Sequence, residues 1–315
     1  FSLPEGWEIV LGNGGSTVFW DVATFGLIEQ TSAHFVFGEF SSKFAEASAA
    51  APHLGNPTVI ESATGDHPAI APVAGADLYA LTHNETSTGV AMQLQRPAGA
   101  DTGAIVAVDA TSAAGGLAWR TSEVDVYYFA PQKCFASDGG LWIAACSPAA
   151  VERIERVHTS KRWIPASLSL KTALDNSRLD QTYNTPALAT LFLLDQQVQW
   201  MLSQGGLDGC AARCAESART LYRWAESREW ATPFVSDVAK RSNVVGTIDL
   251  TDPAVGGVSA NDVSAALRVN GIVDTDSYRK LGRNQLRIGM FPAVPPSDVS
   301  ALTQCVDYVV NALLS

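Results

Sequence analysis

Six short apolar segments in the first 150 residues constrain most strongly what this chain can fold into. They are Trp7–Leu11, His34–Phe37, Leu78–Thr82, Ile105–Asp109, Val124–Phe129 and Leu141–Ala145. Several are apolar at nearly every position, which is typical of β-strands that are covered on both faces. The stretches between them leave room for helices, and Ser16–Ile28 is predicted to be one. Strands that alternate with helices predict an α/β fold with a layered sheet.

The second part of the chain has a different order of elements. A helix is predicted at Ser147–Val157, and Thr185 and Pro186 favour a helix start before Ala187–Ser203, which ends at two glycines. Further helices are predicted at Asp208–Glu229, Ala260–Asn270 and Ser297–Leu314, and further strands at Val244–Leu250 and Asn284–Phe291. This order predicts a smaller α+β unit. We therefore expect a large domain at 1–205 and a small C-terminal domain at 206–315.

Composition excludes several classes of function. A net charge of -11 argues against electrostatic binding of nucleic acid or of an anionic membrane. The five cysteines include no C-x-x-C pair, which fits reduced thiols in a cytoplasmic protein. Cys210 and Cys214 lie four residues apart, so they are expected to face one core. The five histidines lack metal-ligand spacing, so no metal is expected.

The first candidate for chemistry is the segment Gly12–Thr17, with the sequence GNGGST. It follows a predicted strand and opens a predicted helix, where free backbone N–H groups and the helix dipole favour an anion such as phosphate. It lacks the lysine of a P-loop and the third glycine of a dinucleotide fingerprint. A simple strand–helix turn is an equally good interpretation of this segment alone.

Two further candidates stand at the ends of predicted strands. Asp109 ends an apolar strand, where a carboxylate can hold a protonated pyridine nitrogen or merely cap a turn. Lys133 follows an aromatic strand, where a partly desolvated amine can form a Schiff base or simply reach the surface. Together with the anion loop, these residues match the phosphate, ring nitrogen and aldehyde of one pyridine cofactor.

Longer stretches of the chain resemble the fold-type-I, class V aminotransferases, and among them the phosphoserine aminotransferase family. The stretches are GNGGST, HNETSTG, AVDATS, YFAPQKCFASDGG, TYNTPA and GIVDTDSYRKLGRNQLRIGMFPAV, and the resemblance extends over nearly the whole chain. It implies a large domain with a mostly parallel mixed sheet between helices and a smaller α+β domain. It also implies pyridoxal 5'-phosphate as the cofactor.

The resemblance assigns roles residue by residue. Lys133 would bind the cofactor aldehyde and shuttle the proton, and Asp109 would pair with the ring nitrogen. Thr86 would bond the phenolic oxygen, and Phe40 would stack on the ring. The phosphate would be held by Gly15, Ser16, Thr111 and Gln132, and by Asn184 and Thr185 of a second copy in a homodimer with shared sites. Arg287 would bind the substrate carboxylate, and Arg279 the substrate phosphate.

The implied reaction is transamination of 3-phosphohydroxypyruvate with L-glutamate to O-phospho-L-serine and 2-oxoglutarate, in serine biosynthesis. A second implied role is transamination of the phosphorylated ketoacid of pyridoxine biosynthesis. Another class V enzyme, such as a small-amino-acid aminotransferase or a cysteine desulfurase, is the alternative. A non-catalytic binding protein with this fold is a third. The family's N-terminal segment has no counterpart here, so we expect a fragment. Tyr278 stands where many members have histidine.

Overall fold

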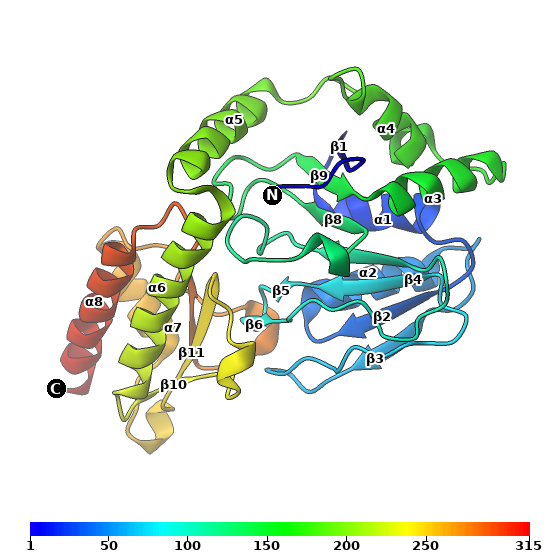
Figure 1. Cartoon of the computed structure of the whole chain (residues 1–315). Helices are drawn as coiled ribbons and strands as arrows, with labels where there is room; N and C mark the ends of the chain where they lie inside the picture. Colours follow the sequence, from blue (N-terminus) through cyan, green and yellow to red (C-terminus); the bar gives the residue numbers. More distant parts are fainter.

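A seven-stranded mixed sheet forms the centre of the larger part of the molecule. The computed structural model describes all of residues 1–315, and Figure 1 shows their arrangement. Along the sheet the strand order is β1 (Glu8–Asn13), β9 (Leu141–Cys146), β8 (Val126–Phe129), β7 (Ile105–Asp109), β4 (Leu78–Thr82), β2 (Ser32–Val36) and β3 (Thr58–Glu61). The strands β8, β7, β4, β2 and β3 are parallel, and β9 pairs antiparallel with both β8 and β1. The expected mostly parallel mixed sheet is confirmed.

Both faces of this sheet are buried, as the apolar segments predict. In β8, Val126 and Tyr128 belong to one core, and Tyr127 and Phe129 belong to the core on the opposite face. The first core is covered by the helices α1 (Ser16–Gly26), α2 (Glu39–Ala50), α3 (Pro148–Thr159) and α4 (Leu170–Ser177). The second lies under the small hairpin of β5 (Asn84–Glu85) and β6 (Val90–Ala91), and under parts of α5 (Leu188–Ser203) and α6 (Gly206–Glu226).

The C-terminal part is a second layered unit with its own core. Its antiparallel sheet has the order β10 (Ala231–Pro233), β11 (Val245–Leu250) and β12 (Gln285–Gly289). The helices α7 (Ala260–Val269) and α8 (Pro296–Leu314) pack against it together with the second half of α6, which runs along this unit in Figure 1. Cys210 and Cys214, in the first half of α6, are buried in the core of the large sheet, as expected. The boundary near residue 205 stays a prediction.

Several predicted elements differ from the observed ones. The predicted cap at Thr185 is wrong, because α5 begins at Leu188 and its N-cap residue is Ala187, which has no side-chain cap. The short strand β3 and the helix α4 were not predicted. In β3 three of the four side chains are exposed, so this edge strand lacks the apolar signal of the others. No helix combines the length and apolar character needed to cross a membrane.

Candidate active site

Four of the predicted site residues meet around one cavity between the two units. Thr86, Gln132, Lys133 and Arg287 line a cavity of about 570 Å³. Lys133 follows β8, Thr86 follows β5 and Arg287 lies on β12, so the cavity draws on both sheets. The ends of parallel strands and the junction of two units are where ligands usually bind in α/β folds.

The amine of Lys133 is partly buried and forms neither a hydrogen bond nor an ion pair with the protein. Burial lowers the pKa of Lys133, and the positive charge of Arg287 lowers it further. An amine with a lowered pKa is uncharged, and therefore nucleophilic, in a larger fraction of molecules at neutral pH. These surroundings distinguish Lys133 from lysines that merely reach the surface, such as Lys171, which pairs with Asp175 at 2.6 Å.

Arg287 is a partly buried arginine without a carboxylate partner. Its guanidinium lies 5.4 Å from the centre of the Tyr278 ring, and one nitrogen donates to the carbonyl oxygen of Thr86 at 3.5 Å. Burial lowers its pKa somewhat, but arginine remains charged at neutral pH. A partly buried guanidinium whose fork is not occupied by a protein carboxylate suits a carboxylate from a ligand.

Asp109, at the end of β7, is a buried carboxylate with three donors. It accepts hydrogen bonds from Trp20 Nε1 at 3.0 Å, from the Thr111 amide at 2.9 Å and from the Thr111 hydroxyl at 2.5 Å. Burial raises the pKa of Asp109, and the bonds from Thr111 and Trp20 oppose this rise. No basic side chain forms an ion pair with it, so a ligand cation would find an uncompensated carboxylate.

The predicted anion loop forms the N-terminus of α1. Gly15 is the N-cap residue, without a side-chain cap, and a Cβ atom at this position would meet no other atom within 4 Å. The hydroxyl groups of the neighbouring Ser16 and of Thr111 are hydrogen-bonded to each other at 2.6 Å. An open helix N-terminus flanked by two hydroxyl groups, one of which also contacts Asp109, is a suitable place for a phosphate.

Thr86 lines the cavity, and Phe40 is linked to it through Tyr278, whose ring also contacts Arg287. The Thr86 hydroxyl donates to Ser112 at 2.8 Å, and the ring of Phe40, on α2, lies 6.0 Å from that of Tyr278. Phe40 is partly buried but does not line the cavity itself. The sequence singled out neither Ser112 nor Trp20 as a site residue. Trp20 could have been found, because it stands one helical turn beyond Ser16 on the predicted helix.

Three further predicted residues belong neither to the Lys133 cavity nor to the hydrogen-bonded network of Asp109, Thr111 and Ser16. Arg279 is exposed and has no ion-pair partner. Asn184 and Thr185 are exposed too, and the Thr185 carbonyl oxygen accepts a weak hydrogen bond from Asn13 at 3.5 Å. Their side chains do not line the Lys133 cavity of their own chain. No group of His, Cys, Asp or Glu side chains is arranged to hold a metal ion.

The arrangement fits a phosphorylated pyridine aldehyde. A free amine faces the cavity at Lys133, a buried carboxylate without a counter-charge lies at Asp109, and an open helix N-terminus lies beside Ser16. These three groups match an aldehyde, a protonated ring nitrogen and a phosphate. The bridge from Asp109 through Thr111 to Ser16 connects two of the three positions.

Comparison with known proteins points to the class-V aminotransferases. The family model described as aminotransferase class-V matches residues 70–274. The phosphoserine aminotransferase of Corynebacterium glutamicum is 59% identical over 99% of this chain and 81% of its own length. The phosphoserine aminotransferase of a Nocardioides species is also 59% identical, over 99% of this chain and 83% of its own length.

Solved structures show the same fold. The phosphoserine aminotransferase of Cytophaga hutchinsonii superposes with a TM-score of 0.88 at 24% identity, covering 97% of this chain and 84% of the other. That of Bacillus circulans gives a TM-score of 0.81 at 20% identity, covering 98% and 82%. The family match and the high identity to full-length relatives lead to one conclusion: this chain belongs to the class-V aminotransferases.

Proposed function

We propose that this chain transfers an amino group from L-glutamate to 3-phosphohydroxypyruvate, giving 2-oxoglutarate and O-phospho-L-serine, with pyridoxal 5'-phosphate as cofactor. The observation that carries the proposal is the free Lys133 amine and the unpaired Arg287 guanidinium on one cavity. The relatives at 59% identity, which are named phosphoserine aminotransferases, support the choice of substrate. Such an enzyme would serve serine biosynthesis.

Each residue has a part that follows from its surroundings. When bound, the cofactor supplies an electron sink for the bond to be broken at the substrate Cα. Lys133 Nζ, with its lowered pKa, would hold the aldehyde until the substrate amine replaces it, and the freed amine would then take the proton from the substrate Cα. Asp109 holds the positive ring nitrogen, and Arg287 orients the substrate through its carboxylate. Thr86 would give its hydroxyl proton, which Ser112 accepts in this structure, to the phenolic oxygen, and Gly15, Ser16, Thr111 and Gln132 would bind the phosphate.

Arg279 is proposed to recognise the distal phosphate of the substrate. It is a free cation in the loop next to Tyr278, whose ring contacts Arg287, whereas its neighbours Lys280 and Arg283 pair with Glu39 and Asp249. Half-reaction kinetics test the proposed function. Arg279→Ala should slow the reaction with phosphoserine far more than that with glutamate, which has no phosphate, and Arg287→Ala should slow both. Equal losses for both amino acids in Arg279→Ala would argue against phosphoserine specificity.

The thiols disfavour the cysteine desulfurase alternative. Such an enzyme needs a mobile nucleophilic cysteine, but Cys134, next to Lys133, is buried and its Sγ contacts the Ser112 carbonyl oxygen at 3.3 Å. Burial raises the pKa of Cys134, which disfavours the reactive thiolate. The five free cysteines, four of them buried, support the inference of a cytoplasmic protein. We also propose that the chain is divided into a large domain at 1–205 and a small domain at 206–315.

We infer that the active form is a homodimer in which Asn184 and Thr185 reach the cofactor phosphate of the second copy. Both are exposed, and the adjoining helix α5 presents apolar side chains to solvent, with Leu188 72% and Phe192 62% exposed. Mixing inactive Lys133→Ala subunits with inactive Asn184→Ala/Thr185→Ala subunits should restore some activity, because hybrids regain one intact site. Subunit exchange without recovery would contradict shared sites.

A further inference from the structure

The carboxylate of Glu85 is buried next to the cavity and has no part in the reaction described above. Its residue is 0% exposed, and no basic side chain forms an ion pair with it. Burial raises its pKa, while its hydrogen bonds oppose the rise. A buried carboxylate is costly unless donors surround it. Here every donor is a backbone N–H group or a serine hydroxyl.

These donors come from two separate segments. At the start of α2, the amide of Phe40 donates at 3.2 Å, and the amide and hydroxyl of Ser41 both donate at 3.0 Å. On the other side, the hydroxyl of Ser87 donates at 2.7 Å. The carboxylate therefore satisfies first-turn amides of a 12-residue helix and also fixes the turn that follows β5.

The approach of the two segments is close enough to require glycine. A Cβ atom at Gly38 would lie 2.3 Å from Cγ of Glu85 and 2.7 Å from the Ser87 hydroxyl oxygen. Any other residue would push the start of α2 away from the β5–β6 turn. Gly38 and Glu85 thus form a joint between them.

Each segment carries one of the residues assigned to the cofactor. Glu85 binds the amide of Phe40, and it directly precedes Thr86 in the chain. The same turn also reaches the small unit, because the carbonyl oxygens of Thr86 and Thr88 accept from Arg287 and Thr247. A displacement of this turn would therefore move the Thr86 hydroxyl relative to both Phe40 and Arg287.

We propose that Glu85 is a positioning residue that sets the ring of Phe40 and the hydroxyl of Thr86 at the correct separation for the cofactor. The inference rests on the proposed function, and on the family resemblance that implies a stacking role on the cofactor ring for Phe40. A buried helix cap that only stabilises the fold would produce the same hydrogen bonds. The two roles differ in what the loss of Glu85 does to cofactor binding.

The test compares Glu85→Ala with Asp77→Ala as a matched control. Asp77 also accepts from consecutive backbone amides, at 2.8, 2.6 and 2.9 Å, but it precedes β4, whereas Thr86 lies beyond the opposite end of that strand. Unlike Glu85, Asp77 also pairs with an arginine, Arg153. Three quantities are measured: the melting temperature of the apo protein, the Kd for pyridoxal 5'-phosphate from fluorescence titration, and the visible circular dichroism of the bound cofactor. Both variants should lower the melting temperature.

Only Glu85→Ala should raise the Kd, at least tenfold, and reduce the dichroic band. Glu85→Gln, which keeps an oxygen for the α2 amides, should recover most of both. Equal Kd changes in Glu85→Ala and Asp77→Ala, or an unchanged Kd and band in Glu85→Ala, would overturn the proposal. If Glu85→Ala does not fold, Ser87→Ala decides, with a several-fold rise in Kd expected and no change contradicting the proposal. Wild-type protein that binds no pyridoxal 5'-phosphate would instead overturn the proposed function.

Discussion

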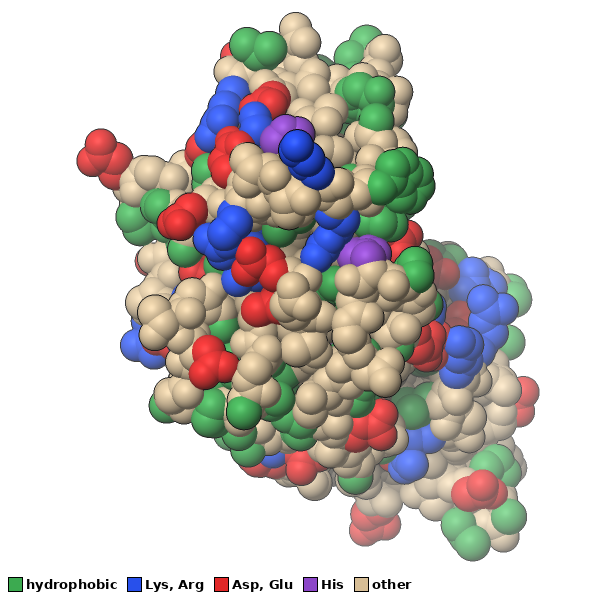
Figure 2. Space-filling model, turned by 90° about the vertical axis from the view of Figure 1, so that its right-hand side faces the viewer, with side chains coloured by type: hydrophobic (Ala, Val, Ile, Leu, Met, Phe, Trp, Pro, Cys, Tyr) green, Lys and Arg blue, Asp and Glu red, His purple; other side chains and the backbone are tan.

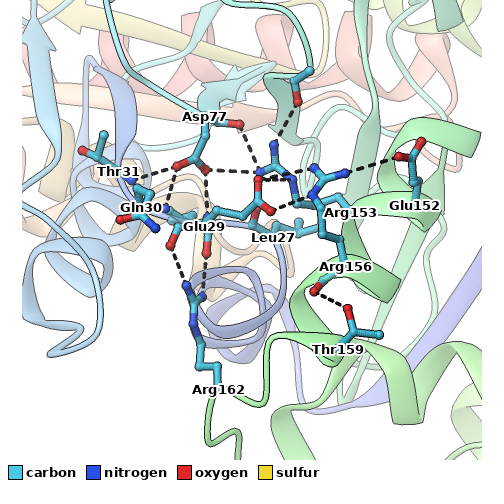
Figure 3. Close-up of polar contacts among 12 residues, drawn as sticks. Leu27, Glu29, Gln30, Thr31, Asp77, Glu152, Arg153, Arg156, Thr159 and Arg162 are labelled. Atoms are coloured by element: carbon cyan, nitrogen blue, oxygen red, sulfur yellow. Dashed lines mark hydrogen bonds and ion pairs between the residues drawn. The ribbon is translucent and has the colours of Figure 1, made fainter.

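The charged side chains beyond the C-terminus of helix α1 are ion-paired, whereas those of the candidate active site, which includes its N-terminus, are not. Beyond its C-terminus, Arg153 is 1% exposed and donates to the carbonyl oxygens of Leu27, Asp77 and Gly103 at 2.6, 3.2 and 2.9 Å (Figure 3). It also pairs with the carboxylates of Glu29 at 3.1 Å and Asp77 at 3.2 Å. Arg162 donates to further carbonyl oxygens there. In the upper part of the face in Figure 2, basic and acidic side chains likewise lie next to one another.

In the candidate active site, which includes the N-terminus of α1, the charges are unpaired. Lys133, Asp109 and Arg287 form no ion pair with an opposite charge, although all three are at least partly buried. Unpaired buried charges cost stability, whereas paired ones are compensated within the protein. The difference indicates that the network around Arg153 serves the fold, and that the charges at the other end are arranged for ligands.

The largest effect is expected from removing Lys133, the lysine of the candidate active site. Lys133→Ala should lower kcat by on the order of 10²–10⁴ or more, because both the covalent attachment and the proton transfer depend on this amine. Borohydride reduction followed by peptide mapping should label Lys133 in the wild type and nothing in the variant. Lys171→Ala, which removes an ion-paired lysine, is the control and should keep full activity. A label on any other lysine would refute the assignment.

In the ion-pair network around Arg153, a substitution should change the free energy of unfolding rather than kcat. Arg153→Met removes a buried cation from two carboxylates, which typically costs about 3–5 kcal/mol of unfolding free energy. Urea denaturation of the apo protein measures this loss, and kcat of the folded protein should stay near that of the wild type. Arg287→Met removes no ion pair and should change the stability by less than about 1 kcal/mol. Similar losses in both variants would contradict the comparison.

A smaller effect is expected at Asp109. Asp109→Asn should retain the cofactor but reduce kcat about 10- to 100-fold, because a charge-assisted interaction is worth about 1.5–3 kcal/mol. An amide cannot hold the positive ring nitrogen as a carboxylate does. Single-turnover absorbance changes after adding glutamate measure the loss. Normal turnover would mean that Asp109, with its bonds to Thr111 and Trp20, only caps the strand.

The sequence predicts the large sheet well because its central strands carry their own signal. Leu78–Thr82 and Ile105–Asp109 are buried at every position and were predicted with the observed bounds. The edge strand Thr58–Glu61 has mostly exposed side chains, and Ala231–Pro233 is only three residues long, so neither has a distinct hydrophobic pattern.

The site could be predicted only in part. Asp109 and Lys133 follow strands of one sheet, so their proximity is implied by the topology once the strands are known. Glu85 and Phe40 are 45 residues apart, and only the packing of α2 against the β5–β6 turn brings them together. The sequence also does not show that Arg287 lacks an ion-pair partner. It shows four basic residues at 279–287, and only the structure shows that Lys280 pairs with Glu39 and Arg283 with Asp249.

The smallest effect concerns the pH dependence of cofactor attachment. The charge of Arg287 contributes to the lowered pKa of Lys133, after burial. Only the deprotonated amine attacks an aldehyde, so attachment speeds up as the pH rises through the pKa of Lys133. In Arg287→Gln the positive charge is gone, and this pKa should therefore move upward. The midpoint of the attachment rate against pH should move upward as well, and attachment below that midpoint should be slower than in the wild type. Stopped-flow absorbance after mixing the apo protein with pyridoxal 5'-phosphate measures both.

Arg283→Gln removes a cation that is already paired with Asp249 and should leave the midpoint unchanged. A midpoint that is unchanged or lower in Arg287→Gln would show that burial alone sets the basicity of Lys133.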